Sequence, residues 1–303
     1  MTDQPFRLVG IGELLWDCFE NLRKPGGAPA NVAFHANQLG MNATVVTRVG
    51  TDPLGAELIG FLDGHNLDTH HIQSDPTHPT GTVTVDMVRA DHPQYTIHEN
   101  VAWDHIEFIE ALRATCSNTH AICFGTLAQR SPVSKKTIQD CIGAAADAIK
   151  IYDVNLRPPY YDRPTIEASL NACDIAKFND EESVVLAEML ELSNPNLESF
   201  AAALRDRYKL DAVCITKGGD GSLIVTKSES ASAPSPKITV ADTVGAGDSF
   251  TAAVAFAQLH GWNAQATATF ANQIAGNIAA NEGAMPRLDR NVIEEIIASA
   301  KGM

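Results

Sequence analysis

The 303-residue chain carries 22 basic and 37 acidic residues, a formal net charge of −15, and 45% of its residues are hydrophobic. This charge disfavours general binding to nucleic acids or anionic membranes, which requires clustered Lys and Arg. The N-terminus lacks a signal-peptide pattern, and no apolar run reaches the roughly 18 residues of a membrane-spanning helix. We therefore expect a cytoplasmic protein with neither nucleic acid nor membrane as a partner.

The N-terminal part alternates between strand and helix patterns. The sequence predicts a strand over Leu8–Gly12, a helix over Pro29–Leu39 and a strand over Thr44–Val49. Pro29 near the first turn and Gly40 after the last are typical helix boundaries.

The pattern then changes to that of an antiparallel hairpin. Thr82–Val88 alternates with period two, and after a turn over residues 90–93 comes a second strand, Tyr95–His98. Because a two-stranded hairpin is only marginally stable alone, we expect it to join a small sheet. We interpret this sheet as a lid built from segments of about 13–25 and 80–100, although an edge ribbon without a catalytic role remains an alternative.

From about residue 120 onward, short apolar runs alternate with helical patterns, which is typical of βαβ units. The predicted strands are Ala121–Leu127, Ala148–Val154, Ile175–Phe178 and Ala212–Thr216. The predicted helices are Pro132–Ala148, Thr165–Ala172, Glu181–Leu192 and Leu197–Tyr208. The polar tract Ser228–Pro236 reads as a surface loop between two strands. We expect an α/β protein with a doubly wound, mostly parallel sheet and helices on both faces, in a single domain over 1–303.

A small-residue turn precedes the helical pattern Ser249–Leu259. Gly245, Ala246 and Gly247 let the backbone approach a ligand, and the free N–H groups of a helix's first turn attract anions. Asp248 follows directly, where an acidic side chain is favoured at a helix start whether or not it is catalytic. The turn therefore predicts a phosphate site, or alternatively an ordinary helix start.

A second glycine-rich string lies some 215 residues upstream. Gly26 and Gly27 lead into a helix that has Asn31 in its first turn. An amide side chain both donates and accepts hydrogen bonds, as binding a sugar hydroxyl requires. The local alternative is an Asn that satisfies backbone groups at the helix start.

Polar side chains also follow several predicted strands. Asn155 and Arg157, Asn179, and Thr216 stand after three different strands. In open α/β sheets ligands bind at the carboxyl edge, although each residue could equally cap a loop. An Arg fork suits phosphate oxygens, so Arg157 is a candidate phosphate contact, with surface pairing to Asp153 or Asp162 as the alternative.

The two glycine strings together resemble the signature regions of the PfkB carbohydrate kinase family, and the likeness runs nearly end to end. The resemblance implies a ribokinase-like fold with a β-sheet lid. It also implies that Gly245, Ala246 and Gly247 form an anion hole and that Asp248 is the catalytic base. For the sugar it implies contacts from Asp17, Gly26, Gly27 and Asn31.

The resemblance extends to ATP and metal ions. It implies that Asn179 and Glu182 organise Mg²⁺ and phosphate through water, and that Thr216, Gly218 and Gly221 lie beside the nucleotide, where we also expect Asn272. The resemblance also implies a monovalent cation, with K⁺ as the candidate, held by Asp242 and the Val244 carbonyl. Since some relatives pair through the lid, a homodimer and a monomer are both compatible with the sequence.

The expected reaction is transfer of the ATP γ-phosphoryl group to a primary hydroxyl of a sugar. The string from Gly26 to Ala33 resembles the fructokinase form of the motif, which favours fructose. His98, a polar lid residue suited to hydroxyls, and Asn155, at a strand end, are further candidate sugar contacts. The Asp153-x-Asn-x-Arg157 string resembles 2-keto-3-deoxygluconate kinases, which makes that sugar acid the alternative. A non-catalytic sugar-sensing protein is the alternative from another class, and the intact Gly245–Asp248 string argues against it.

Overall fold

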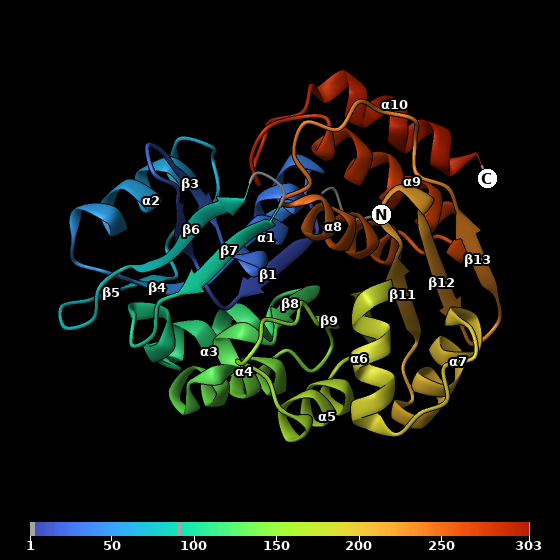
Figure 1. The fold of residues 1–303 in the computed structure, drawn as a ribbon, viewed down its shortest axis with the longest axis horizontal. Helices are drawn as coiled ribbons and strands as arrows, with labels where there is room; N and C mark the ends of the chain where they lie inside the picture. The colour runs from blue at the N-terminus through green and yellow to red at the C-terminus, as the bar shows by residue number, and fades with distance from the viewer. Residues whose placement is uncertain (1–3, 90–91, 303) are drawn as a thin grey trace.

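The computed structural model describes residues 4–89 and 92–302, and a nine-stranded sheet forms its centre (Figure 1). The strand order is β13-β12-β11-β10-β9-β8-β1-β4-β5. The strands are β1 Arg7–Ile11, β4 Asn42–Gly50, β5 Ile72–Asp75, β8 Ala121–Gly125, β9 Ile149–Asp153, β10 Ile175–Asn179, β11 Ala212–Thr216, β12 Ser222–Thr226 and β13 Ser230–Ala233. All neighbouring pairs from β11 to β5 are parallel, whereas β12 and β13 add an antiparallel edge.

Helices cover both faces of the large sheet. One face carries α1 Ala28–Gln38, α2 Pro53–Asp63, α8 Ala246–Leu259, α9 Ala264–Ala279 and α10 Arg290–Lys301. The other carries α3 Glu110–Ser117, α4 Pro132–Ala144, α5 Arg163–Ala172, α6 Asp180–Leu190 and α7 Leu197–Tyr208. Successive strand residues point to opposite faces, so Leu8 enters the first apolar core and Val9 the second. Figure 1 shows the two helix layers on either side of the sheet.

A second sheet of four strands lies beside the large one, in the order β3-β2-β6-β7. Its strands are β2 Leu15–Cys18, β3 Arg23–Gly26, β6 Gly81–Arg89 and β7 His92–Ile97. The outer pairs are antiparallel, but β2 and β6, which come from distant segments, pair in parallel. Leu15, Val83 and Val85 form its small apolar core.

The predicted fold class is confirmed, with differences at element boundaries. The tract Ser228–Pro236, expected to be a surface loop, contains β13, because Ala231 and Ala233 bury alternate side chains while backbone pairing to β12 orders the segment. Helix α4 ends at Ala144 rather than Ala148, and α8 begins at Ala246, three residues before the predicted start. The hairpin turn predicted over 90–93 lies partly outside the described residues. Among the described residues, no helix has the length and apolarity to cross a membrane.

Candidate active site

A cleft of about 1180 Å³ lies at the carboxyl edge of the large sheet, between the start of α8 and the small sheet. Most of the predicted site residues line it, and they come from well-separated parts of the chain. They are Asp17, Gly27, Asn31, Asn155, Arg157, Asn179, Glu182, Thr216, Gly218, Gly221, Asp242, Val244, Gly245, Ala246, Gly247, Asp248 and Asn272. Gly26 and His98 are not among the lining residues.

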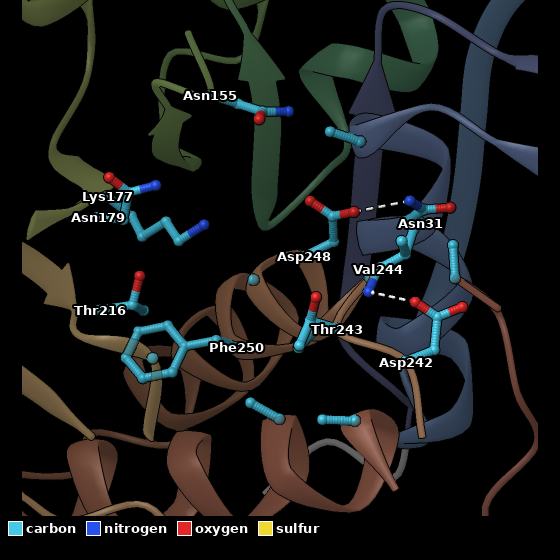
Figure 2. Close-up of a pocket in the computed structure, with 18 of the residues that line it drawn as sticks. Asn31, Asn155, Lys177, Asn179, Thr216, Asp242, Thr243, Val244, Asp248 and Phe250 are labelled. Atoms are coloured by element: carbon cyan, nitrogen blue, oxygen red, sulfur yellow. Dashed lines mark hydrogen bonds between the residues drawn. The ribbon is translucent and has the colours of Figure 1, made fainter. Parts of the chain in front are cut away.

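Asp248 stands in the first turn of α8 and points into the cleft (Figure 2). The helix is capped by Gly245, whose φ of 79° is readily accessible only to glycine, and not by a side chain. The Asp248 carboxylate instead accepts a hydrogen bond from the Asn31 amide, with Nδ2 and Oδ2 2.6 Å apart. The structure therefore gives Asp248 a partner across the cleft rather than the role of a helix cap.

Asn31 reaches this position because α1 begins immediately after Gly27. Gly27 has a φ of 114°, and any side chain on it would collide with the Glu13 backbone. While the Asn31 Nδ2 donates to Asp248, its Oδ1 atom is buried without a hydrogen-bond partner among the described residues. Since a buried acceptor without a partner is costly, this atom is suited to a hydroxyl donor from a ligand.

Three carboxyl groups gather around this point, and sequence reasoning identified only two of them. Burial raises the pKa of Asp17 to about 6 and that of Glu13 to about 7. Removal from bulk water raises the pKa of Asp248 to about 6, and the negative charge of Asp153 adds to the rise. Glu13 was missed because it directly follows the predicted strand Leu8–Gly12 and is itself followed by apolar residues. The signal that could have found it is a carboxyl group at a buried position, where its burial is costly unless it has a role.

These raised pKa values predict an acid limb in the pH–rate profile. A protonated Asp248 cannot accept a hydroxyl proton, so kcat/KM for the sugar should fall as pH drops below about 6. The measurement is kcat/KM between pH 5 and 8, with Asp17→Asn as a comparison that retains the limb set by Asp248. A profile that stays flat down to pH 5 would contradict the assignment of Asp248 as base.

Cationic side chains also border these carboxyl groups, among them Arg157 and Lys177. Arg157 is exposed at the cleft and donates to the neighbouring Leu156 carbonyl, 3.1 Å away; in the described part of the chain it pairs with neither Asp153 nor Asp162. Asp153 is instead paired with Lys177, which is buried and also lines the cleft. Sequence reasoning missed Lys177 because it stands inside an otherwise apolar strand.

At the far end of the cleft, Asn179 and Glu182 have structural partners. The Asn179 side chain accepts a hydrogen bond from the Glu182 N–H at 2.7 Å, and the Glu182 carboxylate accepts one from the Asn179 N–H at 2.9 Å. Together they form a capping box on α6. The other Glu182 oxygen accepts from the Leu156 N–H at 2.6 Å. Because both carboxylate oxygens already accept hydrogen bonds, contact with a metal ion through water fits this site better than direct ligation.

Beside these side chains, the same end of the cleft presents exposed backbone at two glycines. Gly218 and Gly221 have φ values of 52° and 90°, and Thr216 ends β11 beside them. Asn272 is buried and donates to the Ala233 carbonyl at 2.7 Å, so it fixes the β13 end that borders the cleft. Glycine backbone without side chains leaves room here for the flat base of a nucleotide.

Asp242, one predicted cation ligand, is already engaged by protein groups. Its carboxylate accepts from the Gly283 and Val244 N–H groups, at 3.0 and 3.1 Å, and from Lys24 Nζ at 3.2 Å. Lys24 lies on β3 of the small sheet. A monovalent cation could use this carboxylate only beside or in place of the Lys24 ammonium.

Two predicted sugar contacts lie elsewhere. His98 is exposed just after β7, and its Nε2 is 2.9 Å from the Thr84 hydroxyl; the preceding residue, Ile97, faces the cleft instead. Alternation along the strand thus turns His98 away from the cleft. Gly26 instead lies against Asp17, because a Cβ at this position would be 2.6 Å from Asp17 Oδ2.

In this α/β fold a glycine-capped helix start and a carboxyl group face the same cleft, an arrangement suited to a ligand that carries phosphate. The family model of the pfkB family carbohydrate kinases matches residues 8–290. The chain therefore belongs to this family of carbohydrate kinases.

Individual relatives agree with the family. The chain is 29% identical to the uncharacterized sugar kinase PH1459 of Pyrococcus horikoshii over 93% of both chains. A structure of that protein with ATP superposes with a TM-score of 0.83 and covers 95% of this chain and 99% of that one. It is 26% identical to a fructokinase of Salmonella typhimurium over 76% of both. A fructokinase of Vibrio cholerae, solved with fructose, ADP and potassium, shares the fold with a TM-score of 0.80 at 21% identity, covering 98% of this chain and 100% of that one.

Proposed function

We propose that this carbohydrate kinase transfers the γ-phosphoryl group of ATP to the 6-hydroxyl of D-fructose. The contact between Asn31 and Asp248 carries the proposal, because it holds a carboxylate and an open amide acceptor together beside the N–H groups that begin α8. One group would accept the hydroxyl proton and the other would fix the hydroxyl-bearing sugar.

The proposed step is a single in-line displacement. The sugar oxygen forms a bond to the γ-phosphorus, the bond from that phosphorus to the β–γ bridging oxygen breaks, and ADP leaves. The hydroxyl proton passes to Asp248. Since the transition state is loose and its charge lies on the equatorial oxygens, positioning and charge stabilisation by Gly245, Ala246 and Gly247 carry most of the catalysis.

The charges at the sugar end favour a neutral sugar over a sugar acid. Glu13, Asp17 and Asp248 all border this part of the cleft, and Lys24 is held by Asp242. Two described cations that border the cleft, Arg157 and Lys237, have no ion pair, and of these two only Arg157 acts on the charge of the three carboxyl groups. A 2-keto-3-deoxygluconate carboxylate would therefore face one unpaired cation among three acidic side chains. This supports fructose as substrate, with the sugar acid as the alternative.

Magnesium would accompany ATP and neutralise charge on its β- and γ-phosphates when bound. Glu182 and Asn179 would hold it through water, in agreement with their occupied hydrogen bonds. The Asp242 carboxylate fits a monovalent cation less well than Glu182 and Asn179 fit magnesium, because the Lys24 ammonium already donates to it.

The small sheet is proposed to act as the lid over the sugar. Val83, Tyr95 and Ile97 from its hairpin line the cleft, and the segment containing Asp17 and Lys24 lines it too. We also propose that residues 1–303 form a single kinase domain. Two such domains would pair through their lids in a homodimer.

The test is a coupled ADP-release assay on fructose, 2-keto-3-deoxygluconate, ribose and adenosine with the purified protein. We expect fructose to give the highest kcat/KM. A clear preference for the sugar acid would overturn the substrate while leaving the kinase class intact. Sugar binding without any ADP release would support the non-catalytic sensor instead.

A further inference from the structure

A buried ion pair underlies the start of α8. Lys177 of β10 and Asp153 of β9 are register partners, with Lys177 Nζ 3.1 Å from both carboxylate oxygens. The side chains are 9% and 3% exposed. From α8, the Thr251 hydroxyl donates to Asp153 Oδ2 at 2.7 Å.

Packing alone does not account for this pair. Its neighbours on the same sheet face, Ile151, Ile175 and Cys214, are buried apolar residues of one core. Burying two charges usually costs as much as their attraction returns, and apolar residues of similar volume would serve the core as well or better. The pair is therefore a candidate for function.

Lys177 points toward the proposed phosphate position. It lines the cleft, and a Cβ placed on Gly247 would lie 3.0 Å from its Nζ atom, so the ammonium stands against the backbone of the first turn of α8. Figure 2 shows its side chain extending toward Asp248. An ammonium has three N–H donors, and its hydrogen-bond partners among the described residues are the two oxygens of Asp153.

The surrounding charges keep this lysine protonated. Burial on its own would lower the pKa of Lys177, but the carboxylates of Asp153, Asp248 and Glu182 raise it above the usual value. A phosphoryl group bound at α8 would add further negative charge.

We infer that Lys177 is a catalytic residue whose ammonium contacts the transferred phosphoryl group, and that Asp153 and Thr251 position it. The inference rests on the proposed kinase reaction. It gives the contact with the transferred phosphoryl group to Lys177 rather than to Arg157. Lys177 is on strand β10, and its ammonium lies beside Gly247 of the anion hole. Arg157, in contrast, is exposed, and its guanidinium donates to the carbonyl of the preceding residue, Leu156. The competing explanation is that Lys177 only anchors α8 through Asp153 and Thr251.

The test compares Lys177→Met with Lys150→Met. Lys150 lies on the same β9–β10 part of the sheet but near the amino end of β9, where it is 3.7 Å from Asp174, so its replacement should leave turnover unchanged. By analogy with the loss of one donor to a transition-state charge, Lys177→Met should lower kcat by about 10²- to 10³-fold. KM for the sugar should remain within about threefold, since ground-state sugar binding is untouched.

A binding measurement separates catalysis from anchoring. Lys177→Met should lose about 100-fold in affinity for Mg-ADP with aluminium fluoride and the sugar, a transition-state mimic, while binding Mg-ADP alone normally. If Lys177→Met does not fold because Asp153 is left unpaired, the variant Asp153→Asn/Lys177→Met removes both charges and takes its place. Normal kcat, or equal losses for Mg-ADP and the mimic, would overturn the inference. Wild-type protein that transfers no phosphate would instead overturn the proposed function.

Discussion

Asp248→Asn should lower kcat by about 10²- to 10⁴-fold while sugar and ATP still bind. The substitution preserves the shape and can keep a hydrogen bond to Asn31, but it removes the only proton acceptor for the sugar hydroxyl in the proposed step. Steady-state kinetics and calorimetric titration with fructose and a non-hydrolysable ATP analogue measure the two properties separately.

The control for this variant is Asp289→Asn. Asp289 caps α10, where it accepts from the Asn291 N–H at 2.8 Å, and asparagine is an equally good cap. If Asp248 served only the helix start, both substitutions would be harmless. Turnover near the wild-type value in Asp248→Asn would therefore remove the base from the mechanism.

Gly245→Ala should disable the anion hole. The φ of 79° is strained for alanine, and the added Cβ would overlap the backbone of Ala284, so the loop must shift. Because the N–H groups that begin α8 would shift with it, we expect kcat to fall by about 100-fold or more, as for loss of a donor that stabilises transition-state charge.

Gly40→Ala separates the effect of backbone strain from the effect of the collision with Ala284. Gly40 has a φ of 87° but open space around its Cβ position, so alanine there meets backbone strain without a collision. The expected cost is about 1–2 kcal/mol of unfolding free energy with normal kcat. Thermal unfolding and kcat measured on both variants check this, and equal kcat in both would show that the Ala284 contact is unimportant.

Much of the large sheet and of the glycine-rich turn could be predicted because local patterns specify them. Alternating strand and helix segments predict a parallel sheet, and the turn Gly245–Gly247 requires residues with little or no side chain. Asn31 and Asp248 were each predicted, but their direct contact joins residues 217 positions apart and depends on how α1 and α8 pack.

Other site residues were hidden by their surroundings in the sequence. Glu13 and Lys177 occur next to or inside apolar strands, and only the packed structure shows that they face the cleft. His98 was assigned to the sugar from its chemistry, but the direction in which its strand turns depends on register. The strand Ser230–Ala233 was missed because its Ser- and Pro-rich surroundings resemble a loop.

The discontinuous build of the small sheet limits how substrate preference could be exchanged between relatives. Leu15–Cys18 pairs in parallel with Gly81–Thr84, so the sheet is assembled from two segments with α1, β4, α2 and β5 between them. A chimera that receives only the hairpin of a relative would join a foreign β6 to the native β2. Grafting would therefore need both segments, Leu15–Gly26 and Gly81–Ile97, together with a matching partner for Lys24 on the Asp242 loop.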